Sequence, residues 1–147
     1  MAEGDCTVYQ SFIANIMKKV IDCSADDFYI TLHTGYTITQ THELWADSGV
    51  SSTEYTTGAG YTAGGKQCTS PSVTKAAAVK FDATDPATWT SLGPLTPATP
   101  SHALLWDTTP TSPADPLVCA FVLGTTATNG GNYTLSFNSA GILTITA

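Results

Sequence analysis

The stretch Glu54-Tyr-Thr-Thr-Gly-Ala-Gly-Tyr-Thr-Ala-Gly-Gly65 divides the chain into two unlike parts. It places four glycines within eight residues, and glycine adopts positive φ and allows close backbone approach without steric cost. Such a run predicts turns or bulges rather than a regular element. An amphipathic helix and one strand precede it, and only short β-like segments follow it. We therefore interpret it as the corner where a helix-and-strand unit passes into a β-sheet body.

The glycine-rich run lacks the pattern of a phosphate-binding loop. Such a loop ends in Lys followed by Ser or Thr, and it leads into a helix whose N-terminus faces the phosphates. Here Lys66 is followed by Gln67, and the residues beyond are rich in Ser, Pro and Val. A β-turn corner is the interpretation that fits.

Composition indicates a β-rich protein with few charges. We interpret the 147 residues as one domain, with residues 1–24 forming a helix packed on a sheet and residues 25–147 forming a β-sandwich body with long loops. Charged residues make up 12% of the chain, about half the usual share, and threonine is the commonest residue. A surface covered with hydroxyl groups rather than charges is therefore expected.

The charge pattern argues against two classes of partner. The net charge is -7, the chain has no arginine, and its five lysines are dispersed. Nucleic-acid binding and polybasic membrane anchoring both need clustered Lys and Arg, so we expect neither. The four cysteines form no Cys-x-x-Cys pair, and no signal peptide is apparent, so we expect reduced thiols in a protein made in a cytoplasm.

Apolar spacing predicts one helix and several strands. Asp5 to about Asp22 has the i, i+3, i+4 spacing of an amphipathic helix with Asp5 as its N-cap. Phe28–Leu32 alternates as a strand. The polar stretch Thr34–Thr53 should contain a short helical turn near Thr41–Asp47, with Trp45 pinning it to the body. Later strands are predicted at 66–74, 76–81, 103–106, 117–123, 133–137 and 142–145, the last two closing a hairpin through 138–141.

These elements predict a mainly β fold: an antiparallel β-sandwich of about 7–8 short strands with one N-terminal amphipathic α-helix. The proline-rich segments Leu92–Ser101 and Asp107–Pro116 are expected to be loops. The predicted core, with the helix stripe lying on the sheet, comprises Phe12, Ile16, Val20, Phe28, Ile30, Leu32, Val118, Phe121, Leu135 and Phe137.

No motif in the sequence indicates an enzyme. His33, His42 and His102 lie far apart in sequence, and Asp26-Asp27 falls at a turn where solvated carboxylates are the default. The acidic residues Glu43, Asp47 and Glu54 lack the spacing of a calcium loop. We expect no catalytic residue, no cofactor and no metal ion.

A carbohydrate-binding β-sandwich module is one alternative, because Trp45, Trp89 and Trp106 could form a sugar platform. Such a platform needs two or more of these rings exposed on one face, whereas a structural protein should bury most of them.

The chain resembles a family of small virion structural proteins of tailed bacteriophages. The resemblance rests on the N-terminal helix leading to Phe28-Tyr-Ile-Thr-Leu32, on His42-Glu-Leu-Trp45, on Gly58–Gly65, and on later landmarks. The chain departs from the family pattern at Ala59, where a bulkier residue is usual, and in the proline-rich stretch 90–94. The later landmarks are Lys80-Phe-Asp82, Trp89-Thr90, Pro116-Leu-Val118 leading to Gly124, Tyr133-Thr-Leu135 and Gly141-Ile-Leu143.

The resemblance implies a capsid cement or decoration protein on the outer face of the head shell. Its partners would be the major capsid protein and further copies of itself, as a homotrimer, and it would be made in the host bacterial cytoplasm. The alternative is another virion component, of the tail or a head fibre. Interface candidates in the loops are Leu44, Trp45, Tyr55, Tyr61, Pro97 and Pro110.

Overall fold

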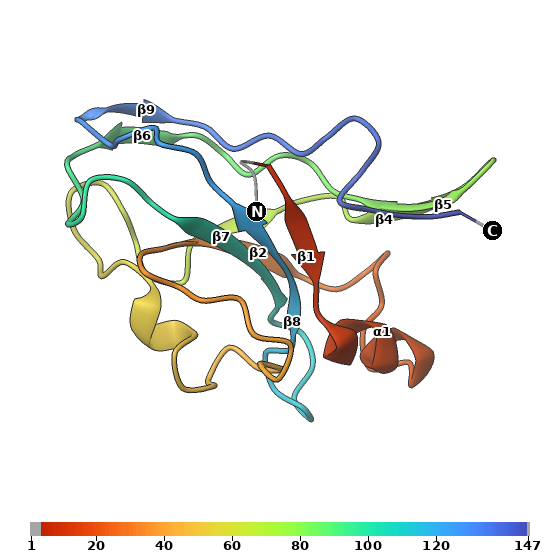
Figure 1. Ribbon diagram of the computed structural model, residues 1–147. Helices are drawn as coiled ribbons and strands as arrows, with labels where there is room; N and C mark the ends of the chain where they lie inside the picture. Colours follow the sequence, from red (N-terminus) through yellow and green to blue (C-terminus); the bar gives the residue numbers. More distant parts are fainter. Residues whose placement is uncertain (1–3, 147) are drawn as a thin grey trace.

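The computed structural model describes residues 4–146, and a five-stranded antiparallel sheet lies at its centre (Figure 1). The strand order is β1-β8-β7-β2-β3. β8 lies inside this sheet, and its first four residues are buried, as its apolar run predicts. The strands are β1 (Cys6–Val8), β2 (Phe28–His33), β3 (Lys66–Cys68), β7 (His102–Asp107) and β8 (Leu117–Val122).

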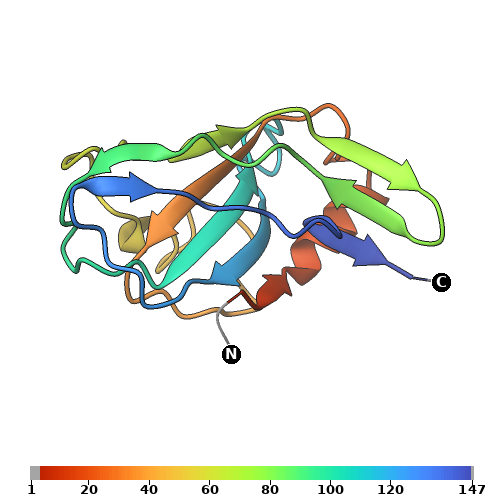
Figure 2. The same cartoon turned by 90° about the horizontal axis from the view of Figure 1, so that it is seen from above.

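Two shorter antiparallel sheets cover one face of the five-stranded sheet, at opposite ends of the molecule (Figures 1 and 2). One pairs β6 (Trp89–Leu92) with β9 (Gly131–Tyr133). The other has the order β10-β5-β4 and consists of β4 (Ser72–Lys75), β5 (Val79–Asp82) and β10 (Leu143–Ile145). We call it the projecting sheet, because it extends beyond the body of the molecule next to helix α1 (Gln10–Met17).

The predicted fold class is confirmed: the chain is mainly β, with antiparallel sheets in a sandwich-like arrangement and one helix. Ten short strands are present in residues 4–146, more than expected. The predicted helix boundaries were wrong at both ends. Residues Cys6–Val8 pair with Phe121, Ala120 and Cys119 of β8, so the apolar spacing there belongs to an edge strand, and the helix begins at Gln10 without a side-chain cap.

The predicted C-terminal hairpin is also wrong. Gly141 donates a backbone hydrogen bond to Asn138, so the turn exists, but the segments it joins do not pair with each other. β10 pairs with β5 and β9 pairs with β6. The segment 66–74 likewise forms two strands, β3 and β4, that belong to different sheets. No helix within residues 4–146 is long and apolar enough to cross a membrane.

The main core lies between the five-stranded sheet and its covering layer. Phe28, Ile30 and Leu32 are buried on this face, and the ring of Phe28 lies 5.1 Å from that of Phe81 on β5. Phe12 of α1 packs on the same Phe81 ring. Five predicted core residues are only half-buried: Ile16, Val20, Phe121, Leu135 and Phe137. Ile16 lines a groove beside α1, and the last three line an open cavity between the layers.

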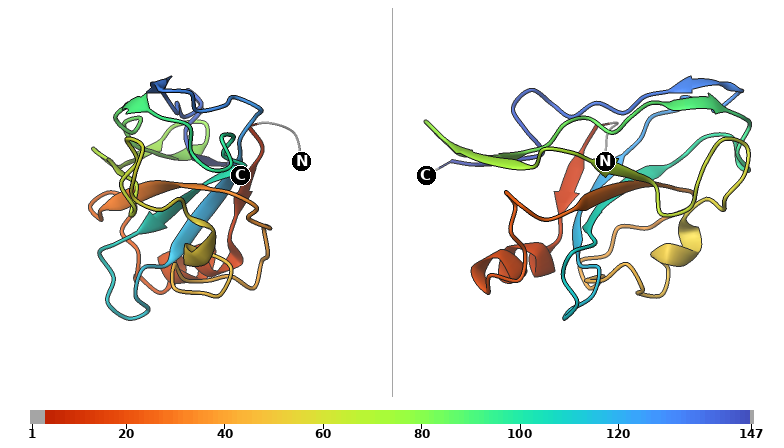
Figure 3. Two further views of the ribbon diagram at one scale, coloured as in Figure 1. Left: turned by 90° about the vertical axis from the view of Figure 1, so that its left-hand side faces the viewer. Right: turned by 180° about the vertical axis from the view of Figure 1, so that it is seen from behind.

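The segment 34–53 covers the opposite face of the five-stranded sheet (Figure 3). Trp45 stacks on Trp106 of β7 with ring centroids 4.6 Å apart, which confirms its predicted pinning role. The short helix in this segment is a 3₁₀ turn at Ser51–Thr53, so the predicted position at 41–47 was wrong. β2 is therefore buried on both faces.

Candidate functional site

The glycine-rich run forms the predicted corner through a two-residue turn. Gly58 and Tyr61 exchange backbone hydrogen bonds of 3.0 and 2.9 Å. The two residues between them, Ala59 and Gly60, have φ of 50° and 85°, as a hairpin turn of this type requires. At Gly60 a Cβ atom would lie 2.6 Å from the carbonyl oxygen of Ser91, so only glycine fits there.

The half-buried carboxylate of Glu54 fixes the shape of this corner. The hydroxyl group of Tyr61 and the N–H of Gly64 donate hydrogen bonds of 2.8 and 2.7 Å to the same Glu54 oxygen. The Tyr61 hydroxyl in turn accepts a 3.0 Å hydrogen bond from the N–H of Leu32. Burial raises the pKa of Glu54. The corner is therefore a rigid unit attached to the central strand β2.

Two other loops join the corner at the same end of the molecule. Gly93 donates a 2.7 Å hydrogen bond to the carbonyl oxygen of Ala59, and the hydroxyl of Tyr55 donates one of 2.7 Å to that of Pro97. The N–H of Leu95 donates a 2.9 Å hydrogen bond to the hydroxyl of Thr128. Three segments that are remote in sequence thus form one surface.

The exposed residues of this surface carry no charge, and the acidic side chain that lines its cavity, Glu54, is half-buried under the corner. No Asp, Glu, Lys or Arg occurs in residues 55–65, 86–106 or 116–147. A shallow cavity of about 290 Å³ lies between the corner and the proline-rich loop. We call the surface the uncharged end, and its exposed residues are Thr56, Thr57, Gly58, Ala59, Gly60, Pro94, Thr96, Pro97, Asn129 and Gly130.

The structure separates the predicted interface residues into three groups. Tyr55 and Tyr61 are buried, so their side chains hold the corner together from inside and the prediction that they contact a partner is corrected. Pro97 is exposed at the uncharged end. Leu44 and Trp45 are half-buried on the segment 34–53, where Leu44 forms a β-bridge with Pro116. Half-buried Pro110 lies in the neighbouring loop, away from the uncharged end.

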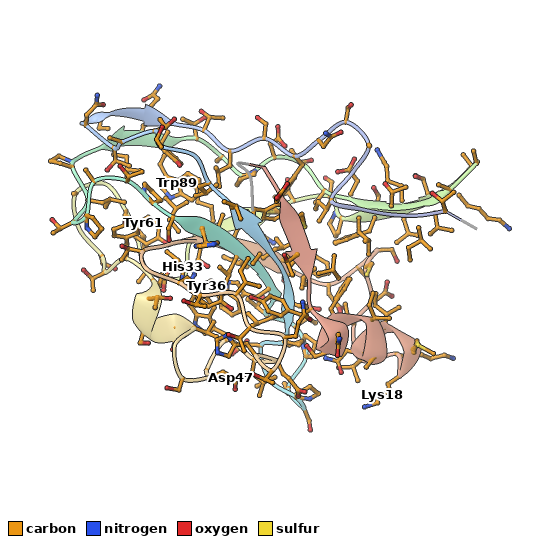
Figure 4. The ribbon with its side chains drawn as sticks, viewed as in Figure 1. Lys18, His33, Tyr36, Asp47, Tyr61 and Trp89 are labelled. Atoms are coloured by element: carbon orange, nitrogen blue, oxygen red, sulfur yellow. The ribbon has the colours of Figure 1, made fainter. Side chains whose placement is uncertain are left out.

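Sequence reasoning missed a cluster of histidine and tyrosine side chains beneath the five-stranded sheet (Figure 4). The hydroxyl of Tyr36 forms hydrogen bonds with that of Tyr9 and, at 2.9 Å, with Nδ1 of His42. The rings of His33 and His102 lie 5.7 and 5.6 Å from the Tyr36 ring. All three histidines of the chain thus surround one tyrosine, although 69 residue positions separate the first from the last (102 − 33).

The cluster does not have the chemistry of a catalytic site. Burial lowers the pKa of His33 to about 3 and also lowers that of His102, so both rings are neutral near pH 7. His33 hydrogen-bonds through both ring nitrogens to the hydroxyls of Thr31 and Thr53, at 2.9 and 3.0 Å. Within residues 4–146 no carboxylate hydrogen-bonds to any of the three histidines. The cluster fastens the segment 34–53 to the sheet.

The three buried cysteines show no activated nucleophile, whereas a hydrogen bond with Cys119 lowers the pKa of the exposed Cys6 thiol. All four cysteines are free, and three are buried. Burial raises the pKa of the Cys23 and Cys68 thiols to about 12. Burial also raises the pKa of Asp107 to about 7, with a further contribution from nearby Asp26. In the described part of the chain no three His, Cys, Asp or Glu residues are grouped as metal ligands.

The tryptophans form no exposed platform. Trp89 is 2% exposed and Trp106 is 8% exposed, while half-buried Trp45 stacks on Trp106. Two of the three rings are therefore committed to the interior. By the criterion that a sugar platform needs at least two exposed rings, this arrangement disfavours a carbohydrate-binding module.

Comparison of the chain with protein-family models, with curated proteins and with solved structures finds no match.

Proposed function

We propose that the protein is a structural virion protein of a tailed bacteriophage, a cement or decoration protein that binds the outer surface of the head shell. The observation that carries this proposal is the uncharged end. It is a rigid surface built from three loops, held by buried and half-buried hydrogen bonds, and rich in threonine and proline. Loops that a scaffold fixes in place are the usual carriers of binding residues.

The chemistry of the uncharged end suits a permanent contact with another protein. Burying a charge costs much more than burying a hydroxyl that finds a hydrogen-bond partner, and the exposed residues of this end bring no charge to the contact. Its exposed backbone and threonine hydroxyls can pair with the backbone of capsid subunits. A protein that spans several subunits gains holding strength from many modest contacts acting together.

Other features support a binding role rather than a chemical one. The buried histidine rings are neutral, and burial keeps the Cys23 and Cys68 thiols protonated. The free cysteines fit synthesis in a reducing host cytoplasm before assembly on the capsid exterior. The proposed partners are the major capsid protein and further copies of the chain itself.

Binding of the purified protein to phage heads that lack it tests the proposal. Thr56→Glu and Thr96→Glu each place a charge on the uncharged end, and both residues are exposed, so the fold should survive. We expect both variants to lose binding. Thr74→Glu, an exposed threonine on β4 at the far end of the molecule, is the matched control and should bind normally.

Imaging of the decorated particles then locates the bound protein. Regular density on the outer face of the shell is the expected result. Density confined to the tail, or equal binding by all four proteins, would contradict the proposal.

A further inference from the structure

The exposed large apolar side chains are confined to the end of the molecule opposite the uncharged end. Met17 is 80% exposed and Ile145 is 53% exposed, and the others in the described chain are Ile13, Val73 and Val79. All of them belong to α1 or to the projecting sheet. An apolar patch of this kind is typical of a protein contact.

A groove lies beside this patch, between the projecting sheet and the segment 16–23 at the end of α1. Figure 2 shows α1 next to the projecting sheet. The groove has a volume of about 400 Å³, and the strand side is lined by Val73, Val79, Phe81, Leu143 and Ile145. Strand register explains this composition. Leu143 lies opposite Phe81, and Ile145 lies opposite Val79, so these side chains share one face of the sheet.

The other face of the projecting sheet is polar. Thr144 lies opposite Lys80, whose Nζ is 2.8 Å from a carboxylate oxygen of Asp82. The two faces of β10 are thus distinct, apolar at Leu143 and Ile145 and hydroxylated at Thr144. A strand that pairs with β10 must match this alternation.

The two edges of the projecting sheet differ in protection. Proteins protect exposed strand edges with charges, prolines or bulges. β4 ends in Lys75 and follows Pro71. β10 reads Leu-Thr-Ile, and within residues 4–146 no strand pairs with its outer edge. β10 is therefore an uncharged, β-branched edge that is open to another strand.

We propose that β10 pairs antiparallel with β10 of a second copy of the chain, about a two-fold axis at Thr144. The pairing joins the two projecting sheets into one six-stranded sheet. On the groove face, Leu143 of each copy lies opposite Ile145 of the other, which gives two identical pairs. On the polar face, the two Thr144 residues lie opposite each other. Thr–Thr pairs are favourable across antiparallel strands, and each Leu–Ile pair removes apolar surface from water.

We choose a second copy as the partner because β10 itself has the properties that its edge requires of a pairing strand: it is uncharged, and it alternates apolar and hydroxyl side chains. A two-fold contact uses the same surface on both subunits, and the β10 edge, which has no charged residue, meets itself without placing like charges together. The same operation brings the two apolar grooves onto one continuous face. A two-fold pair replaces the three-fold association expected from the sequence, and it leaves the uncharged end free for a different partner.

Cross-linking tests the register. Opposed residues of antiparallel strands have Cα atoms about 4.5–5.5 Å apart, within the range that a disulfide spans. Thr144→Cys should therefore form a disulfide-linked dimer under mild oxidation. Both variants carry Cys6→Ser, because Cys6 is exposed. Thr74→Cys, on the protected edge β4, is the matched control and should stay monomeric on a non-reducing gel, as should Cys6→Ser alone. Cross-linking of Thr74→Cys but not of Thr144→Cys would overturn the proposal.

Analytical ultracentrifugation of the purified protein tests the contact without capsids. We expect a concentration-dependent dimer, with the dissociation constant raised by about tenfold or more in Ile145→Lys. Val73→Lys puts the same charge on the same face at the other edge, and it should leave the dimer intact. A monomer at every concentration, a trimer, or a dimer lost equally in both variants would overturn the proposal. None of these measurements depends on capsid binding.

Discussion

The hydroxyl group of Tyr61 donates a 2.8 Å hydrogen bond to the carboxylate of Glu54. The same hydroxyl accepts a hydrogen bond from the N–H of Leu32 in β2. One buried side chain thus connects the first residue of the glycine-rich run, the middle of that run and the central sheet. The rigidity of the uncharged end depends on this connection.

Tyr61→Phe should destabilise the fold by about 1–3 kcal/mol, because it leaves the Leu32 N–H and part of the Glu54 carboxylate without a partner. Chemical denaturation measures the free energy of unfolding. Thr56→Ala, on the exposed side of the same corner, is the control and should change it by less than about 0.5 kcal/mol. Equal stability of Tyr61→Phe and the natural protein would show that the connection does not stabilise the corner.

Trp45→Ala should lower the free energy of unfolding by about 2 kcal/mol or more, since it removes a half-buried ring stacked on Trp106. Limited proteolysis should then cut within residues 34–53, which this ring holds to the sheet. Met17→Ala removes an exposed side chain and serves as the control. A variant with full stability but impaired capsid binding would instead make Trp45 a contact residue.

The alternating strand Phe28–Leu32 and the apolar run at Leu117 were predictable, because burial on defined faces leaves a local pattern in the sequence. The pairing of strands with one another was not predictable from the sequence. β10 follows a turn that would suit a hairpin, yet it pairs with β5, which lies 62–66 positions earlier in the chain (143 − 81 and 145 − 79). The corner was predictable because glycine is required at Gly60 and at Gly65, where a Cβ would lie 2.0 Å from a carbonyl oxygen of β2.

Burial of polar side chains was the least predictable feature. Nothing local to Tyr55 or Tyr61 distinguishes a contact residue from one that hydrogen-bonds inside the fold. The three histidines meet around Tyr36 only because β2, β7 and the segment 34–53 are brought together by the whole chain. The only sequence signal was the position of His33, directly after the predicted strand Phe28–Leu32.

Acid should weaken the fold through His33. Its pKa in the folded state is about 3, below the ordinary value of 6.5, so the neutral ring stabilises the fold above pH 6.5. This stability is lost as the pH falls from about 6.5 towards 3, with a slope approaching about 1.4 kcal/mol per pH unit. His102, whose pKa is also lowered, acts in the same direction.

Comparison of the natural protein with His33→Gln isolates this contribution. The variant should be less stable at pH 7. Its free energy of unfolding should fall less steeply than that of the natural protein between about pH 6 and about pH 4, where His33 binds its proton on unfolding. Parallel pH profiles for the two proteins would exclude His33 as the source of the acid sensitivity.

Asp107 should have the opposite pH dependence. Its folded-state pKa of about 7 lies above the ordinary 3.8, so ionisation of this buried carboxyl destabilises the fold as the pH rises between these values. Asp107→Asn keeps the shape and cannot ionise. The stability of the variant relative to the natural protein should therefore be greater at pH 8 than at pH 5, by about 2 kcal/mol. A difference of the opposite sign would mean that the carboxylate is stabilised in the fold.

Retention of the protein on phage particles at low and high ionic strength tests the central claim most directly. Screening shortens the Debye length from roughly 30 Å at about 0.01 M salt to roughly 3 Å at about 1 M, which weakens contacts between exposed charges. A contact made by the uncharged end should not weaken as the salt concentration rises. We predict full retention after both washes, with particles stripped of the protein by other means bursting at a lower temperature. Near-complete release of the protein from the particles at moderate salt would contradict binding through the uncharged end.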